Sequence, residues 1–447
     1  MLSGLMFFPR GGSAHVARAL ASQLPAHGWD VTLVTGSRSG HGDARAFYAG
    51  LDVHPVDFDA GDAPMHPSYE DRPDAPDPVF AALDDVAFER HTAAWATALD
   101  DARADEHDVL HLHHLTPLHE AARRVAPGVP IVTHLHGTEL LMLEAIADGA
   151  PWPYAEAWAR RMRRWAQASE RLLVLTPGQV QRAVDLLGVD PGRCVLCPNG
   201  FDPECFDDVE VDRPAHWRRH LVTEPRGWRP GGDEGSVGYS AQDIAPLTVG
   251  GPVLISVSRF TAVKRLGLLV RAWARAQGDG RLPSDASLVL LGGYPGEWEG
   301  EHPCDAVTDS GARNVFLAGW HGHDELPSFL AASDALVLAS VREQFGSVLV
   351  EAMACGLPPI AVDRFGPADI VDDGVTGWLV GPDDEAALAD AIVEAITDPV
   401  ERRRRGRRAW RTARDRFSWP ALAGDLAGVM DEVADVADER LARPSTA

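Results

Sequence analysis

Short apolar runs alternate with amphipathic stretches along most of the chain. In the first half a helical pattern at Ala14–His27 follows the first apolar run, and the runs lie at Leu2–Phe8, Asp30–Thr35, Val109–His113, Ile131–His136 and Arg171–Thr176. Parallel strands need helical crossovers, so this alternation predicts a parallel sheet with helices on both faces. The segment from Asp57 to Pro78 is rich in Asp, Pro, Ala and Gly, which predicts a surface loop.

The alternation restarts after an irregular segment. Val211–Gly251 is rich in Pro, Gly, Trp, Arg and Asp without a sustained period, which predicts an insertion and interdomain linker. Beyond it, strands are expected at Val253–Val257, Ser287–Leu291, Asn314–Leu317, Ala335–Ala339, Pro359–Val362 and Thr376–Val380. We therefore expect an α/β protein with two Rossmann-like domains at 1–210 and 252–418, and a C-terminal helix at 419–441 that packs back on the first domain.

Size and charge restrict the class of protein. A chain of 447 residues exceeds the size at which one core stops growing, which agrees with two domains. The net charge of −25 argues against a nucleic-acid partner, which needs a basic surface. Five cysteines without framework spacing, no signal-peptide pattern and no long apolar run lead us to expect a cytoplasmic protein with reduced thiols.

The most informative segment is the strand, loop and helix at 335–356. Ligands of parallel sheets bind outside the carboxyl ends of strands, where this loop lies. A helix beginning near Ser347 presents free N–H groups and a positive dipole end to a phosphate. Gly346 allows close approach of the backbone, and Ser347 caps the helix or donates to a phosphate oxygen.

Charged residues accompany this segment. The carboxylates of Glu343 and Glu351 are good hydrogen-bond acceptors for sugar hydroxyls. Their spacing alone is equally consistent with two acidic residues that have no common function. Arg259 and Lys264 follow the strand Val253–Val257 and are suited to neutralise a diphosphate leaving group. Either cation alone is typical of an ordinary protein surface.

Taken together, these motifs resemble the donor site of family 4 glycosyltransferases. The matching strings are SRFTAVK, EQFGSVLVEAMACGLPPIAV, GPADIVDDGVTGWLV, NGFD and HLHGTEL, which begin at Ser258, Glu343, Gly366, Asn199 and His134. The resemblance covers nearly the whole chain outside Asp57–Pro78 and 211–251. It implies a retaining enzyme with the GT-B fold, in which two Rossmann-like domains face each other across a deep cleft.

The resemblance implies roles for the charged residues. Arg259 and Lys264 would bind the donor diphosphate and stabilise it as it leaves. Glu343 would contact the transferred sugar, and Glu351 would accept from the ribose hydroxyls.

Backbone groups also have implied roles. The amides of Gly346, Ser347 and Val348 would meet the phosphates or the sugar, and the backbone at Gly319 and Trp320 would meet the base. The loop Phe365–Pro367 resembles the family's glycine-containing loop near the sugar. Asp369 stands where the family commonly has Glu, which leaves its role open.

The N-terminal half carries the remaining candidates. Gly11 and Gly12 resemble the glycine loop that faces the donor phosphates and the acceptor, and His15 would touch either ligand or be structural. His136 matches the family histidine near the reacting sugar, where a neutral imidazole or its carbonyl stabilises positive charge. The predicted catalytic residues are therefore His136, Arg259, Lys264 and Glu343.

Four further histidines invite a metal interpretation. They are His111, His113, His114 and His119, and no carboxylate or cysteine lies at ligand spacing nearby. GT-B enzymes typically replace the metal's charge by Arg, Lys and a helix N-terminus. We therefore expect no metal, and no cofactor apart from the nucleoside diphosphate sugar as co-substrate.

The expected activity is transfer of a hexosyl unit from a nucleoside diphosphate sugar, UDP-sugar being favoured, to a hydroxyl acceptor. The acceptor is open between a glycan, a lipid-linked sugar and a small metabolite. Alternatives are a sugar-nucleotide epimerase or phosphorylase on the same fold, an NAD-dependent dehydrogenase, and a non-catalytic sugar-nucleotide sensor or glycan-binding protein. Two interpretations remain open for the arginine-rich helices at Trp152–Ala168 and Arg402–Arg416. Their basic faces either contact the inner face of a membrane peripherally or are simply exposed to solvent.

Overall fold

The structure, a computed structural model, describes residues 1–9, 11–40, 42–61, 63–70, 77–206 and 209–442. The chain forms two compact units, and it passes from one to the other after Asn199 and again after Ser418. The first unit contains Met1–Asn199 and the C-terminal helix, and the second contains Gly200–Ser418. Each unit holds one parallel sheet, which confirms the predicted α/β class.

The sheet of the first unit has seven strands in the order β3-β2-β1-β4-β5-β6-β7. Its strands are β1 (Leu2–Leu5), β2 (Thr32–Ser37), β3 (Asp52–Asp57), β4 (Leu110–His113), β5 (Ile131–His134), β6 (Arg171–Val174) and β7 (Cys194–Leu196). Because β1 pairs with both β2 and β4, the strand order reverses beside β1.

Seven helices between the strands and one at the C-terminus belong to this unit among the described residues. They are α1 (Gly12–Gln23), α2 (Ala44–Phe47), α3 (Asp85–Asp101), α4 (Leu118–Val125), α5 (Thr138–Ala147), α6 (Ala155–Ala168), α7 (Pro177–Leu187) and α18 (Trp419–Ala442). In α6 the buried residues Trp158, Met162 and Trp165 recur at helical spacing, so one face of this arginine-rich helix enters the core.

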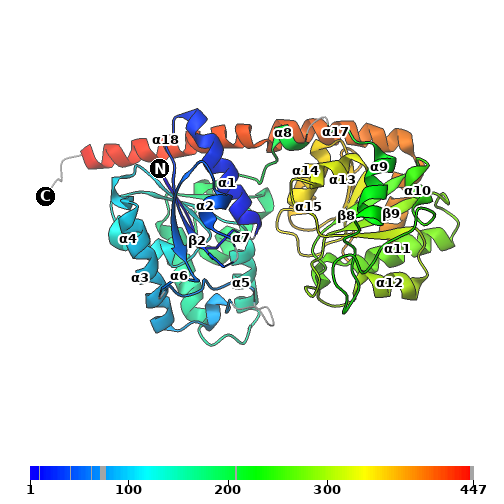
Figure 1. The fold of residues 1–447 in the computed structure, drawn as a ribbon. Helices are drawn as coiled ribbons and strands as arrows, with labels where there is room; N and C mark the ends of the chain where they lie inside the picture. The colour runs from blue at the N-terminus through cyan, green and yellow to red at the C-terminus, as the bar shows by residue number, and fades with distance from the viewer. Residues whose placement is uncertain (10, 41, 62, 71–76, 207–208, 443–447) are drawn as a thin grey trace. The chain divides into compact units, whose positions relative to one another are not determined.

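Helix α18 packs on the first unit beside α1 (Figure 1). Its buried side chains include Leu426 and Met430, which join a core cluster with Leu20 of α1. The indole of Trp29 donates a hydrogen bond of 3.0 Å to Asp431, which ties the helix to the chain before β2.

The sheet of the second unit has six strands in the order β10-β9-β8-β11-β12-β13. Its strands are β8 (Val253–Val257), β9 (Ser287–Leu291), β10 (Val315–Gly319), β11 (Ala335–Leu338), β12 (Pro359–Val362) and β13 (Trp378–Val380). Its helices are α8 (Pro203–Phe206), α9 (Arg213–Arg218), α10 (Ala245–Thr248), α11 (Leu266–Gly278), α12 (Pro303–Ser310), α13 (Leu326–Ala331), α14 (Ser347–Ala354), α15 (Gly366–Ile370), α16 (Glu385–Thr397) and α17 (Pro399–Phe417).

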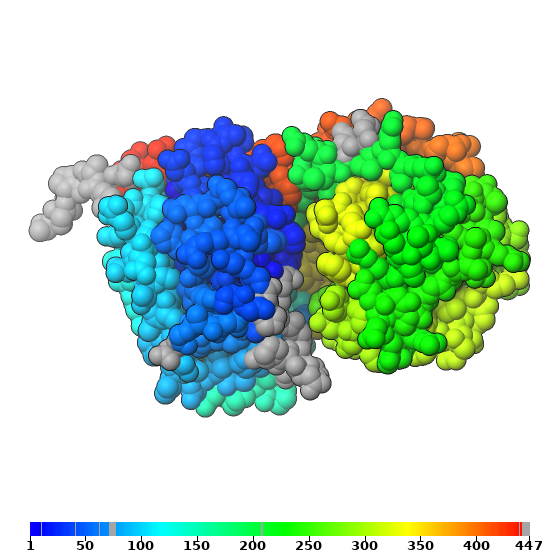
Figure 2. All heavy atoms as spheres, in the orientation of Figure 1, coloured from blue at the N-terminus to red at the C-terminus, as the bar shows by residue number. Residues whose placement is uncertain are grey.

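Residues 211–251, predicted from the sequence as an insertion and linker, pack as part of the second unit. They form much of the surface of that unit seen in Figure 2, where they are green. Trp217 and Trp228 are fully buried, and the Trp228 indole donates to the Gly293 carbonyl at 3.1 Å. The Tyr239 hydroxyl accepts from the Leu317 N–H at 2.8 Å, beside the edge strand β10.

The edge strand β3 of the first sheet escaped the sequence analysis. β3 carries Pro55 and polar residues, which an edge strand tolerates because one side of its backbone remains unpaired. β7 is only three residues long. The run predicted at Ile131–His136 ends as a strand at His134, which leaves His136 in the following loop. Residues 62 and 71–76 of the predicted surface loop lie outside the described residues.

Candidate functional site

The candidate donor site lies where the order of the second sheet reverses, between β8 and β11. The loops after these two strands are joined by a hydrogen bond of 3.0 Å from the Val341 N–H to the Val263 carbonyl. A crevice at such a reversal is the usual ligand position in a doubly wound sheet.

Lys264 and Glu343 meet at this point. Lys264 ends the short 3-10 helix η6 (Ala262–Lys264) after β8, and its ammonium forms an ion pair with the Glu343 carboxylate after β11. Both side chains are largely but not fully buried, with 17% and 20% exposure. Arg259 is exposed in the same loop as Lys264 and forms no ion pair among the residues that the structure describes.

Helix α14 begins directly after Glu343's loop. Gly346 is the residue that precedes its first turn and has φ +96°, a left-handed conformation that favours glycine. No side-chain hydrogen bond caps this end, and no acidic residue lies in the first turn of the helix. Ser347, considered from sequence as a cap, instead occupies the first helical position.

Glu351 lies one turn further along α14 and is 7% exposed. Its carboxylate oxygen Oε1 is 2.9 Å from Nε2 of His323, which lies in the segment after β10. The sequence analysis missed His323, because nothing in its local pattern connects it with a residue 28 positions away. The structure therefore adds a positioning contact to this carboxylate.

The loop Phe365–Pro367 closes against the same site. The Gly366 N–H donates to the Glu343 carbonyl at 3.2 Å, and a Cβ atom on Gly366 would lie 2.4 Å from Phe345. Only glycine fits this contact. Asp369 lies in the short helix α15 that begins here and is half-buried.

Gly319 and Trp320 lie at the carboxyl end of β10. Gly319 has φ +77°, and a Cβ atom there would meet the Arg226 carbonyl at 2.0 Å. Trp320 is 51% exposed and its ring centroid lies 6.1 Å from that of Tyr294, which is also exposed. This edge of the second sheet therefore presents two aromatic rings to solvent.

The glycine pair of the first unit precedes α1. Gly11 and Gly12 are exposed, and a Cβ atom at either would meet nothing within 4 Å. Within the first unit, a larger residue would therefore fit at either position without a steric clash. His15, one turn along, is half-buried and packs edge-on against Phe47 with ring centroids 5.2 Å apart.

His136 lies in a buried group of histidines at the end of β4 and β5. Its backbone N–H donates to Glu139 at 2.8 Å, and its Nε2 is 3.0 Å from Nδ1 of His113. Burial and the neighbouring His114 keep the pKa of His136 well below its usual value, so the ring is neutral at pH 7. Burial favours the neutral form of Glu139, but interactions with His114 and the His136 N–H outweigh it and lower the Glu139 pKa.

Some arginines of the basic helices form ion pairs within their own units, whereas Arg403, Arg407 and Arg408 of α17 are exposed. In α6, Arg161 pairs with Asp85, and Arg164 with Glu120 at 2.7 Å. In α17, Arg405 is 7% exposed and pairs with Glu401. No helix within the described part of the chain is long and apolar enough to cross a membrane.

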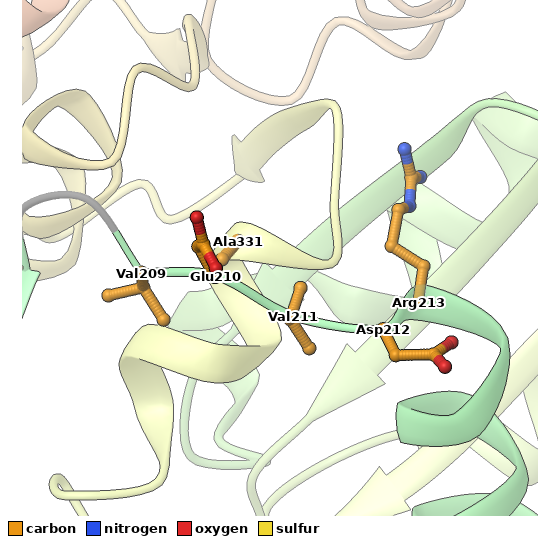
Figure 3. A pocket seen from close by; sticks show the side chains of 6 residues that line it. All are labelled: Val209, Glu210, Val211, Asp212, Arg213 and Ala331. Carbon is orange, nitrogen blue, oxygen red and sulfur yellow. The ribbon is translucent and has the colours of Figure 1, made fainter.

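A separate surface pocket lies beside the segment that precedes α9 (Figure 3). It is lined by Val209, Glu210, Val211, Asp212, Arg213 and Ala331. None of the predicted donor residues lines it, and Arg213 is held by an ion pair of 2.7 Å with Asp334. The pocket is therefore distinct from the candidate donor site.

Comparison with known proteins agrees with this arrangement. The model of the family described as Glycosyl transferases group 1 matches residues 242–412, and that of Glycosyltransferase Family 4 matches residues 10–205. HepE from Anabaena, solved with UDP and glucose, has a TM-score of 0.68 at 19% identity, over 96% of this chain and 99% of that chain. The two sheets thus define a GT-B fold.

Relatives define the family. D-inositol 3-phosphate glycosyltransferase of Stackebrandtia nassauensis is 30% identical over 72% of this chain and 67% of its own length. N-acetyl-alpha-D-glucosaminyl L-malate synthase of Bacillus anthracis is 23% identical over 93% of this chain and 92% of its own. The protein belongs to glycosyltransferase family 4 and is a glycosyltransferase, as the sequence predicted.

Proposed function

We propose that the protein transfers a hexosyl unit from a UDP-sugar to a hydroxyl acceptor with retention of anomeric configuration. The observation that carries this proposal is the grouping of Lys264, Glu343 and Glu351 at the N-terminal half of α14, where the strand order of the second sheet reverses. Support for uracil as the base comes from HepE, which was solved with UDP.

The donor diphosphate is assigned to the cations and the helix end. Arg259 and Lys264 supply positive charge from the loop after β8, and the N–H groups of Ser347 and Val348 supply it from α14. These groups neutralise the charge that grows on the leaving phosphate. In this proposal the donor site needs no divalent metal.

The two carboxylates are assigned to hydroxyl groups. Lys264 orients the Glu343 carboxylate, so that it accepts hydrogen bonds from the transferred sugar. His323 holds Glu351 in the same way toward the ribose. Trp320 and Tyr294, at the adjacent strand ends, are suited to lie near the base.

Retention is proposed to follow a front-face route. The bond from the anomeric carbon to the phosphate oxygen breaks, and the acceptor oxygen bonds to the same face of that carbon. The acceptor's hydroxyl proton passes to the departing phosphate oxygen, so no covalent enzyme intermediate is formed. By the family resemblance, the neutral His136 is assigned to the charge that develops at the sugar.

Small hydroxylated acceptors are the first class to test. The names of the two relatives specify inositol 3-phosphate and L-malate, which are both small, anionic and hydroxylated. We propose that this chain uses an acceptor of the same chemical kind.

The first experiment measures thermal stabilisation by UDP, GDP, ADP and their sugar conjugates, for the wild type, Arg259→Ala and Glu351→Ala. Stabilisation of the wild type by uridine nucleotides, lost in both variants, is expected. An acceptor screen with the stabilising donor follows, and the anomeric configuration of the product is determined by its proton coupling constant. Stabilisation only by another nucleotide would contradict UDP, and an inverted product would contradict the front-face route.

A further inference from the structure

Three histidines that the donor site does not use lie together in the first unit. His111 and His113 stand two residues apart on β4, and His134 lies directly opposite His113 on β5. Leu110 and Leu112 face the main core, so the alternation of the strand sends the histidines to the other face of the sheet. Tertiary structure thus brings His134 beside two histidines that precede it by 21 and 23 residues.

The three rings lie close together. The centroids of His111 and His113 are 4.5 Å apart, and that of His134 lies 5.5 Å and 5.3 Å from them. One nitrogen atom from each ring can be chosen so that all three lie within 4.8 Å of one another. Tetrahedral zinc, with Zn–N distances of about 2.0–2.1 Å, needs nitrogens about 3.4 Å apart, so the rings would have to move closer together on binding.

These nitrogens have few other partners, although the His134 ring also interacts with the backbone of Cys197. Nε2 of His111, Nε2 of His113 and the ring nitrogens of His134 are buried without a hydrogen bond of acceptable geometry. The three side chains are at most 1% exposed, and buried polar groups left unsatisfied are costly.

We propose that His111, His113 and His134 form a binding site for one divalent transition-metal ion, with Zn²⁺ the best match. Three imidazoles without a carboxylate among them suit zinc and exclude the oxygen-seeking Mg²⁺ and Ca²⁺. The site revises the sequence-based expectation for this histidine group, because the third ligand comes from a neighbouring strand. It leaves the proposed donor site in the second unit free of metal.

The ion also determines which ring nitrogen of His136 carries the proton. Ligation through Nε2 of His113 leaves the His113 proton on Nδ1, which is 3.0 Å from Nε2 of His136. His113 then donates this hydrogen bond, and His136 carries its own proton on Nδ1. The metal thereby orients a residue that the family resemblance assigns to the reacting sugar.

The test uses the full chain with its affinity tag removed, stripped with a chelator and titrated with Zn²⁺ against a chromophoric competitor. Bound metal is counted by mass spectrometry after gel filtration. One ion per chain is expected in the wild type, with affinity at least 100-fold weaker in His111→Gln and His134→Gln. Matched controls are His119→Gln, a buried histidine bonded to Thr133, and His220→Gln, from a second group with His321 and Glu325.

X-ray absorption of the zinc-loaded wild type makes the result independent of variant folding. A first shell with three imidazoles supports the proposal. Two imidazoles with a carboxylate would place the ion at His220, His321 and Glu325 and would overturn it. Absence of stoichiometric binding by the wild type, or equal binding by folded His111→Gln and His134→Gln, would overturn it as well.

Discussion

The ammonium of Lys264, after β8, forms an ion pair with the carboxylate of Glu343, after β11. The two residues are 79 positions apart, and the pair spans the point at which the strand order reverses. Each partner therefore orients the other before any ligand arrives, in a position where a sugar diphosphate is expected to lie.

Replacing Lys264 tests the leaving-group role. Lys264→Met removes a cation aimed at developing phosphate charge, so kcat for transfer is expected to fall about 10²–10³-fold, the usual effect of losing one such contact. Nucleotide release measured at saturating donor gives kcat directly. The matched control is Arg265→Met, because Arg265 is the adjacent cation but pairs with Asp383. An unchanged kcat in Lys264→Met would remove the residue from the proposed mechanism.

Gly346→Ala tests the approach of the donor to α14. The added Cβ lies 3.0 Å from Leu349 and 3.2 Å from Glu343 in a backbone with φ +96°. The strain is expected to lower the free energy of unfolding by about 1–2 kcal/mol. The shifted helix end should also weaken UDP binding by about tenfold, or ~1.4 kcal/mol, in isothermal titration calorimetry.

Gly356→Ala is the control for strain alone. Gly356 has φ +76° at the other end of α14, and its added Cβ meets nothing within 4 Å. It should lose stability without losing UDP affinity. Equal UDP affinities for the two variants would mean that the backbone at Gly346 does not meet the donor.

His323→Ala tests the orientation of Glu351. Loss of the 2.9 Å contact removes one hydrogen bond that positions the carboxylate, so UDP binding should weaken by about 1 kcal/mol, or roughly fivefold. The comparison ligand is 2′,3′-dideoxyuridine diphosphate, which has no ribose hydroxyls. It should bind wild type and variant equally, and a fivefold loss for this analogue too would show that His323 acts elsewhere.

His91 tests the cost of a buried neutral imidazole. Burial and the neighbouring Arg90 lower its pKa to about 4, whereas an unfolded histidine titrates near 6.5. Between these values the unfolded chain binds more protons, so the stability conferred by the neutral ring is lost as pH falls below 6.5. From pH 7.5 to 5.5 the loss is about 1.3 kcal/mol for this residue.

Urea unfolding at the two pH values measures this loss. The wild type should lose about 1.3 kcal/mol more than His91→Leu between pH 7.5 and 5.5, with chelator present throughout. The same pH dependence in both proteins would mean that His91 is protonated equally in the folded and unfolded chains.

Much of the fold could be read from the sequence. Buried parallel strands are continuous apolar runs, and the helices between them have a clear period, so the central strands of both sheets were predicted close to their observed bounds. Edge strand β3 was missed because it contains Pro55 and polar residues instead of a continuous apolar run, a composition that only a strand with one unpaired edge tolerates. The packing of 211–251 was missed because Trp217 and Trp228 are buried by contacts distant in sequence.

The sequence by itself determined the family and the residue types of the candidate donor site, because these depend on motifs within single loops after strands. Only the tertiary structure decided which side chains meet. Strand order brings Lys264 to Glu343 and His323 to Glu351. It also brings His134 to His111 and His113. Paired parallel strands place residues side by side whatever the number of residues between them along the chain, so no sequence pattern predicts this contact. Local sequence patterns indicate which residue types form a site, and the order and pairing of the strands decide which of those residues come into contact.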